Sequence, residues 1–432
     1  QRFDRLAQLH DEEVYSSCLS GTRRYYPPMA MILTATLFLC TLAGAALGVY
    51  WLIATFRILQ TKLLLPTARA GLSMPAPDAL VCVIIPAHNE ARVIGNLIHS
   101  LRQQDHPRVR FVLALDRCTD GTASVARAAI GPDERFEIIE IQSCPDDWAG
   151  KVNAVWTALH ASAHAKDADM LLFSDADTTF HPGCVRASTA LLESRKLDLL
   201  SLMSTLTTDT WYEQLVQPAA GFELMQQYPP LHASRAQRRR AFANGQFMLF
   251  RAESYWAFGG HEQVKDHLLE DLGLARIVAR EELDAGVLLA DGVLISRMYA
   301  SWTEFRKGWK RIYTECANRK PRRLLRAARR MLVVYSILPV LTVAGLIMGL
   351  IGFQTDPAWL HTMSIWVPAV ALVLWCFGLL IVYKMSTSPM WSVFLHPWAA
   401  WRVVGILREA ASDLLSDRPT EWGGRSYNRV SR

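Results

Sequence analysis

The sequence predicts an α/β domain with a mostly parallel sheet, joined to transmembrane helices. Between residues 79 and 312, short apolar runs rich in β-branched residues alternate with segments of helical periodicity, which is typical of a parallel sheet covered by helices. Three uncharged stretches outside this region are long enough to cross a bilayer. The chain has 432 residues and is 51% hydrophobic, more apolar than a soluble enzyme and less apolar than a protein made only of spans.

The apolar stretches divide the chain into segments. The stretch 389–407 contains Pro397, Arg402 and several Trp residues, so we expect it to lie in the membrane interface, with a fourth span as the alternative. The expected segments, in order, are an N-terminal polar segment 1–30, a transmembrane helix 31–56, the α/β domain 79–312, a basic interfacial segment 313–330, transmembrane helices 331–353 and 364–383, the segment 389–407 and a C-terminal tail 408–432.

Basic residues indicate how the chain is oriented. The run "RKPRRLLRAARR" precedes the second expected span, and Arg57, Lys62 and Arg69 follow the first. Because Lys and Arg favour the cytoplasmic side, we expect an integral protein of the inner or cell membrane with its α/β domain in the cytoplasm. The net charge of +6 fits contact with an anionic bilayer. No nucleic-acid partner is expected, since the basic run lacks interleaved aromatic residues.

Polar side chains gather where the predicted strands end. The strands are expected at 79–86, 109–116, 135–141 and 169–175. Because the carboxyl ends of parallel strands share one edge, ligands bind there. The side chains that follow these strands are Asn89, Glu90, Asp116, Asp120, Lys151, Asp175 and Asp177. Each has an ordinary structural explanation alone, such as a turn or an exposed helix start, but their coincidence on one edge favours a binding site.

Asp175 and Asp177, in "SDADTTF", form a pair at i and i+2 after a buried strand. Both side chains of such a pair point to the same side of an extended segment, where two carboxylates repel each other. A divalent cation with a preference for oxygen ligands, Mg²⁺ or Mn²⁺, would relieve this repulsion. Taken alone, the pair is also compatible with residues that cap a turn.

Six phrases in order carry a resemblance to a known family: "VIIPAHNEA", "LDRCTDGTASVA", "WAGKVNA", "SDADTTF", "ANGQFMLFR" and "HLLEDLGLAR". Together they resemble the membrane-bound family 2 glycosyltransferases, which have a GT-A fold. Within that family, "FANGQFMLFR", "GGHEQVKDHLLEDLGLARIV" and "LISRMYASWTEFRKGW" are most similar to the enzymes that act on carotenoids such as hydroxychlorobactene.

The resemblance implies roles for the residues of this chain. Asp177, with Asp175, is implied to hold Mg²⁺ or Mn²⁺, which stabilises the diphosphate leaving group of a UDP-sugar. Asp271 is implied to be the general base, next to Glu270. The residues implied to bind the donor are Pro86, Asn89, Glu90, Asp116, Lys151 and Asp175, and those implied to line the acceptor or sugar pocket are Asn244, Gly245, Gln246 and Trp309.

One departure from the family bears on the product. Processive polysaccharide synthases of this superfamily have a Gln-x-x-Arg-Trp motif, whereas "FRKGWKR" keeps Trp309 but has Phe305 and Gly308 in place of Gln and Arg. We therefore expect inverting transfer of a single sugar, preferably glucose, to a hydroxylated membrane lipid, preferably carotenoid-like. The alternatives are transfer to ceramide, diacylglycerol, a hopanoid or a polysaccharide, a nucleotidyltransferase, and a non-catalytic membrane scaffold.

Overall fold

A computed structural model describes residues 27–233, 241–352, 358–422 and 425–427. Most of the predicted polar segment 1–30 therefore lies outside the described residues. The chain divides into two compact units. One comprises Gln1–Leu52 and Leu338–Trp375, and the other comprises Ile53–Ile337 and Cys376–Arg432.

The second unit is built on a seven-stranded sheet with the order β3-β2-β1-β4-β8-β6-β9. The strands are β1 Val81–Ala87, β2 Val109–Asp116, β3 Phe136–Ile141, β4 Met170–Phe173, β6 Leu199–Met203, β8 Met248–Arg251 and β9 Ala285–Leu289. All neighbouring pairs are parallel except those of β8, which runs antiparallel to β4 and β6. Every residue of β1 is buried, as expected for an apolar run covered on both faces of a sheet. The predicted α/β fold with a mostly parallel sheet is confirmed.

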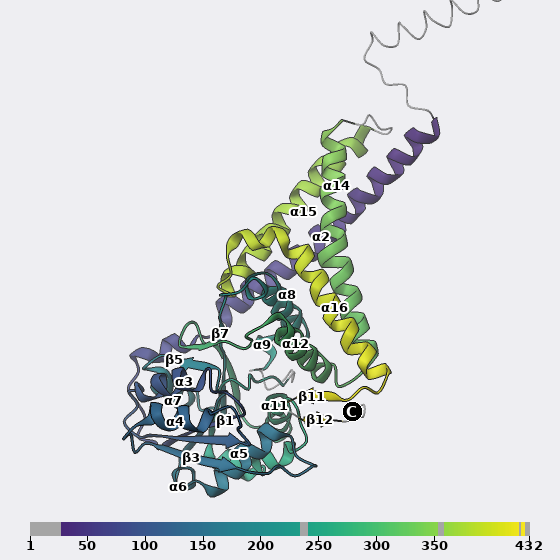
Figure 1. Ribbon diagram of the computed structural model, residues 1–432. Coiled ribbons are helices and arrows are strands. Elements are labelled where there is room, and N and C mark those ends of the chain that lie inside the picture. Colours follow the sequence, from purple (N-terminus) through teal and green to yellow (C-terminus); the bar gives the residue numbers. More distant parts are fainter. Residues whose placement is uncertain (1–26, 234–240, 353–357, 423–424, 428–432) are drawn as a thin grey trace, which may run out of the picture. The chain divides into compact units, whose positions relative to one another are not determined.

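Helices cover both faces of this sheet (Figure 1). Helices α3 (Ile94–Arg102), α4 (Thr122–Ile130) and α7 (Cys184–Ser194) contribute to the core on one face. Helices α5 (Gly150–Ala161), α6 (Ala163–Lys166), α10 (Ala252–Ala257) and α11 (Glu270–Arg280), with the 3₁₀ helix η2 (Gly260–Val264), contribute to the core on the other. The loops at the carboxyl ends of β1, β2 and β4 therefore meet at one edge of a layered α/β domain.

Two small sheets complete the second unit. Strands β5 (Thr178–Phe180), β10 (Leu294–Ser296) and β7 (Thr205–Leu206) form one of them. Because β5 begins directly after Asp177, its antiparallel pairing with β10 brings the residues after Ser296 to the end of β4. The other is a hairpin of β11 (Thr420–Trp422) and β12 (Arg425–Tyr427) near the carboxyl terminus.

The remaining helices of the second unit include α16 and five that pack against it, namely α8, α12, α13, η3 and η4. The bounds of all the remaining helices are η1 Ala68–Ser73, α8 Trp211–Gln227, α9 Pro230–Ala233, α12 Trp302–Cys316, α13 Pro321–Arg330, the π-helix η3 Met331–Ile337, η4 Met390–Leu395 and α16 His396–Leu415. Lys310 of α12 forms ion pairs with Glu409 and Asp413 of α16, at 2.9 and 2.7 Å. One face of α16 is thus fixed to the α/β domain, while Trp398 and Trp401 are exposed.

The first unit contains α14 (Leu338–Leu350) and parts of α2 (Pro27–Leu64) and α15 (Ala358–Met385). Its helices pack closely at glycines: a Cβ at Gly44 would lie 3.3 Å from Pro368, and one at Gly349 would lie 2.8 Å from Ser364 Oγ. Such small residues allow apolar helices to approach each other.

Three helices in the described part of the chain are long and apolar enough to cross a membrane: Met31–Leu64, Pro321–Leu350 and Ala358–Met385. Each helix extends past the expected span at one end or at both, because hydropathy marks the apolar stretch, whereas the helical hydrogen bonding continues into the flanking residues. The stretch 389–407 falls on η4 and α16, which are not among these three. Its interfacial position remains a prediction.

Candidate active site

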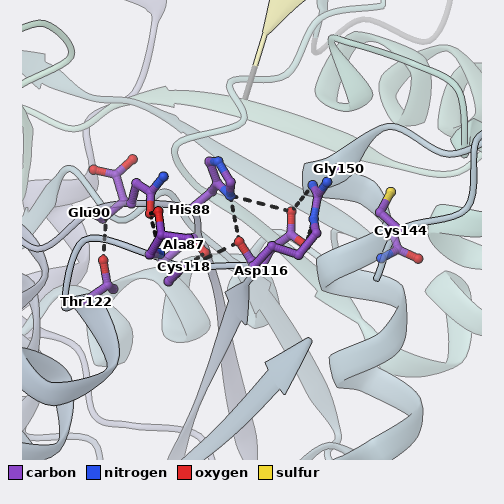
Figure 2. Close-up of polar contacts among 12 residues, drawn as sticks. Ala87, His88, Glu90, Asp116, Cys118, Thr122, Cys144 and Gly150 are labelled. Atoms are coloured by element: carbon purple, nitrogen blue, oxygen red, sulfur yellow. Dashed lines mark hydrogen bonds and ion pairs between the residues drawn. The ribbon is translucent and has the colours of Figure 1, made fainter. Parts of the chain in front are cut away.

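Asp116 ends β2 with its carboxylate almost fully buried. The next residue, Arg117, donates two hydrogen bonds to it, from Nε to Oδ1 at 2.8 Å and from Nη2 to Oδ2 at 2.6 Å. His88 Nδ1 lies 2.6 Å from the Asp116 carbonyl oxygen (Figure 2). Arg117 was not predicted as a site residue, although its place directly after a strand that ends in Asp was a usable signal.

The loop after β1 is joined to the loop after β2. The side-chain Oδ1 of Asn89 accepts a hydrogen bond from Thr119 N–H at 2.8 Å. The Glu90 N–H donates to Thr122 Oγ1 at 2.8 Å (Figure 2). The predicted donor residue Pro86 lies within β1, one residue before its end. These contacts fix the backbone around the Glu90 carboxyl group, whose pKa is raised to about 7 by burial and by the carboxylates of Asp175 and Asp120.

Lys151 lies in the first turn of α5, between two acidic groups. Its Nζ is 2.6 Å from Asp175 Oδ1 and also forms an ion pair with Glu270 Oε1. Burial opposes the charge on Lys151, but the two carboxylates outweigh it and raise the pKa of the ammonium above its ordinary value. The structure therefore brings together three predicted site residues from the first turn of α5, the end of β4 and the start of α11.

Asp177 has a buried carboxylate oxygen, Oδ1, that makes no hydrogen bond within the described residues. Burial and the charges of Asp175 and Glu90 raise the pKa of its carboxyl group well above the ordinary value. No cluster of three or more His, Cys, Asp or Glu residues in the described ranges forms a complete set of metal ligands.

Asp271 and Glu270 begin α11 and contact the loop 243–247. Asp271 Oδ2 accepts a hydrogen bond from Gly245 N–H at 2.9 Å, and its Oδ1 accepts one from Leu272 N–H at 2.7 Å. Burial and the neighbouring Glu270 carboxylate raise the pKa of Asp271 to about 6. A Cβ at Gly245 would lie 3.1 Å from Asp271 Oδ2, so the absence of a side chain allows this close approach.

The other predicted acceptor-side residues are partly engaged within the protein. Asn244 Nδ2 donates to the Leu202 carbonyl at 2.9 Å, and Gln246 Nε2 donates to Ser296 Oγ at 2.7 Å. These bonds tie the loop 243–247 to β6 and β10. Trp309 is buried on α12, and its Nε1 has no hydrogen-bond partner in the part of the chain that the structure describes.

A residue of the carboxyl-terminal hairpin also reaches this edge. Tyr427 Oη accepts a hydrogen bond from Gly150 N–H, the first residue of α5, at 3.2 Å. Gly150 lies against Asp116 as well, since a Cβ there would be 3.3 Å from Asp116 Oδ2. The sequence carried no signal for this contact, because Tyr427 lies far from Gly150 along the chain.

The sheet, with Asp175 and Asp177 after its central strand β4, has the GT-A-like fold of glycosyltransferases. Residues 77–311, more than half of the chain, match the family described as glycosyltransferase like family 2. The chain therefore belongs to this family, which confirms the predicted family, fold class and enzyme class.

Two sequence relatives and one solved structure are similar to this chain. The 4,4'-diaponeurosporenoate glycosyltransferase of Staphylococcus aureus (strain MRSA252) is 26% identical in an alignment 372 residues long, and the match covers 80% of this chain and 88% of that protein. The protein of the same name from strain USA300 is 29% identical over 255 residues, 56% of this chain and 62% of the relative. Among solved structures, a mannosyltransferase from Pyrobaculum calidifontis in complex with GDP-Man and Mn²⁺ has a TM-score of 0.47 and 17% identity, and the match covers 89% of this chain and 99% of that one.

Proposed function

We propose that this glycosyltransferase moves one sugar, preferably glucose, from a UDP-sugar to a hydroxylated apolar lipid in the membrane, with inversion at the anomeric carbon. The observation that carries the proposal is the buried, unpartnered Asp177 Oδ1 at the carboxyl end of the sheet, beside Asp175 and Glu90. A carotenoid-like acceptor is favoured, because the relatives described above are named as 4,4'-diaponeurosporenoate glycosyltransferases.

A divalent cation fits the residues at this edge. Two carboxylates with an unpaired buried oxygen offer oxygen ligands and negative charge. Mg²⁺ is often held by one or two carboxylates together with substrate phosphates, so a complete protein cage is not required. Bound Mg²⁺ or Mn²⁺ supplies positive charge to the diphosphate as the bond to the sugar breaks.

Lys151 and Asp271 have separate tasks in the proposed reaction. Lys151, fixed by Asp175 and Glu270, adds positive charge on the donor side of the site. Asp271 takes the proton from the acceptor hydroxyl, while the oxygen of that hydroxyl bonds to the anomeric carbon. The bond from that carbon to the diphosphate breaks at the same time, and UDP leaves with the electron pair. Attack from the face opposite the leaving group inverts the anomeric centre.

Transfer of a single sugar is favoured over polymer synthesis. Gly308 stands where processive synthases have Arg, and the three candidate spans in the described ranges are few for a polymer channel. The chain's apolar helices fit an acceptor that is itself dissolved in the bilayer.

The test is product formation by the full chain in lipid nanodiscs with Mn²⁺. UDP-glucose, UDP-galactose, UDP-N-acetylglucosamine and GDP-mannose are each supplied with a hydroxylated carotenoid, a carboxylated carotenoid, ceramide or diacylglycerol. We expect mass spectrometry to detect one added hexose on the hydroxylated carotenoid with UDP-glucose. A hexose only on ceramide or diacylglycerol, or a polymeric product, would contradict the acceptor proposal.

A further inference from the structure

Tyr299 is a buried side chain to which the proposed reaction gives no task. Its relative exposure is 6%, and its hydroxyl has no hydrogen-bond partner among the described residues. Most buried hydroxyl groups in proteins are paired, because burial removes their hydrogen bonds to water. An unpaired phenol at the edge of a ligand site therefore indicates a partner that arrives with the ligand.

The fold holds Tyr299 close to the acidic pair. Strand β10 ends at Ser296, which is paired with Thr178 at the start of β5. The next residue, Arg297, donates its N–H to the Asp177 carbonyl at 3.0 Å. Tyr299 follows only two residues later, so its backbone is fixed beside the end of β4.

Two aromatic residues hold Tyr299, Phe305 at its ring and Tyr212 at its backbone. Its ring packs edge-on against Phe305, with 5.6 Å between the ring centroids. Its carbonyl accepts a hydrogen bond from Tyr212 Oη at 3.2 Å. A fixed side chain loses little conformational entropy when a ligand binds, which suits a binding residue.

The phenol of Tyr299 occupies space that is free only because residue 308 of α12 is a glycine without a side chain. A Cβ at position 308 would overlap the Tyr299 Oη, Cε1 and Cζ atoms. No side chain can therefore extend from position 308 toward this part of the site while Tyr299 keeps its place. The departure seen in "FRKGWKR" thus has a structural counterpart, since the group that fills this volume is the phenol of Tyr299.

The charges around Tyr299 make it a hydrogen-bond donor. Burial raises the pKa of its hydroxyl, and Asp177 and Asp175 raise it further against the opposing charge of Arg311. The phenol therefore keeps its proton at neutral pH. Asp177 Oδ1 nearby is an unpaired acceptor, yet no hydrogen bond joins it to Tyr299 within the described residues. One ligand that carries both a cation and an anionic oxygen would supply a partner to each: the cation to Asp177 Oδ1 and the anionic oxygen to the Tyr299 hydroxyl.

We propose that the Tyr299 hydroxyl donates a hydrogen bond to an anionic diphosphate oxygen of the sugar donor and so helps to hold the leaving group. This inference rests on the proposed function, because it requires a nucleoside-diphosphate donor at Asp175 and Asp177. A hydrogen bond to a charged oxygen is stronger than one between neutral groups, so removal of the hydroxyl should weaken binding of the diphosphate about tenfold.

Tyr299→Phe in the full chain tests the proposal. Affinity for UDP with Mn²⁺ is measured by isothermal titration calorimetry, and affinity for uridine, which has no phosphate, is measured by competition. We expect about a tenfold loss for UDP and no loss for uridine. We also expect the melting temperature without ligand to stay the same or rise, since the lost hydroxyl makes no bond in the protein.

Tyr228→Phe is the matched control. Its hydroxyl donates to the Cys316 carbonyl at 2.8 Å, so the variant should lose stability and keep its UDP affinity. Equal UDP affinity in wild type and Tyr299→Phe would overturn the inference and leave the proposed function standing. A parallel loss of uridine affinity would also overturn it, because the phenol would then shape the nucleoside pocket. Failure of the wild type to bind any nucleoside diphosphate would overturn the proposed function as well.

Discussion

Asp271 is the residue through which the rate should depend on pH. Its carboxyl group accepts hydrogen bonds from two backbone N–H groups, and its pKa is raised to about 6. Only the unprotonated carboxylate can accept the acceptor's proton, so kcat/KM should fall as the pH is lowered through about 6 and level off above it. A pH–rate profile of sugar transfer measures this.

The same residue is tested by Asp271→Asn. Loss of the general base should lower kcat about 100-fold or more, with little change in donor affinity. Glu253→Gln, which neutralises an exposed carboxylate on α10, is the matched control and should keep full activity. If Asp271→Asn keeps the wild-type kcat, Asp271 is not the general base. The same conclusion follows if its kcat/KM falls at low pH as in the wild type.

Individual residues differ in how far the sequence could identify them. Asp175 and Asp177 were predicted because two carboxylates directly follow a buried strand, and strand ends can be recognised locally. The ion pair from Lys151 to Glu270 could not be predicted, because it joins residues that only the folded sheet brings together. Tyr299 was missed for a related reason: a buried phenol without a partner becomes visible only when its surroundings are known.

At the scale of elements, the loop 243–247 must lie close to the start of α11. Gly245 allows this, since a Cβ would lie 3.1 Å from Asp271 Oδ2 and 3.3 Å from Glu270 Oε1. Gly245→Ala should displace the base and lower kcat about tenfold or more, because small errors in the position of a catalytic group slow the reaction strongly. Steady-state kinetics and UDP affinity, measured in parallel, separate this effect from loss of binding.

Gly221→Ala on α8 is the control for this variant, because a Cβ at that position would meet nothing within 4 Å. It replaces a glycine inside a helix and should leave activity unchanged. Equal kcat in wild type and Gly245→Ala would show that the loop 243–247 does not position the base.

Among the elements, local signals predicted the first half of the sheet better than the second. The runs at 79–86 and 109–116 correspond closely to β1 and β2, because continuous β-branched apolar residues are typical of a fully buried strand. The antiparallel β8 and the three-stranded sheet of β5, β10 and β7 had no such signal. Their short strands depend on pairing with distant segments, which periodicity within one window does not report.

At the scale of the whole molecule, three apolar helices indicate membrane association, and the basic residues near them predict that the α/β domain faces the cytoplasm. Lys166→Cys, on the exposed end of α6, provides a reporter. A membrane-impermeant maleimide should label this cysteine only after spheroplasts are permeabilised. The unsubstituted chain, measured in parallel, gives the labelling of the native cysteines. Labelling in intact spheroplasts would place the domain on the opposite side.

Asp175 and Asp177 are proposed to hold a divalent cation for a nucleotide-sugar donor. The most direct measurement is UDP release from UDP-glucose by the purified full chain, with acceptor lipid present, in Mn²⁺ and then in chelator. We expect turnover that stops in chelator and falls at least 100-fold in Asp177→Asn. The variant Asp167→Asn, which changes an exposed acid, should stay active. Turnover that persists in chelator or in Asp177→Asn would contradict the role of these two aspartates in holding a cation.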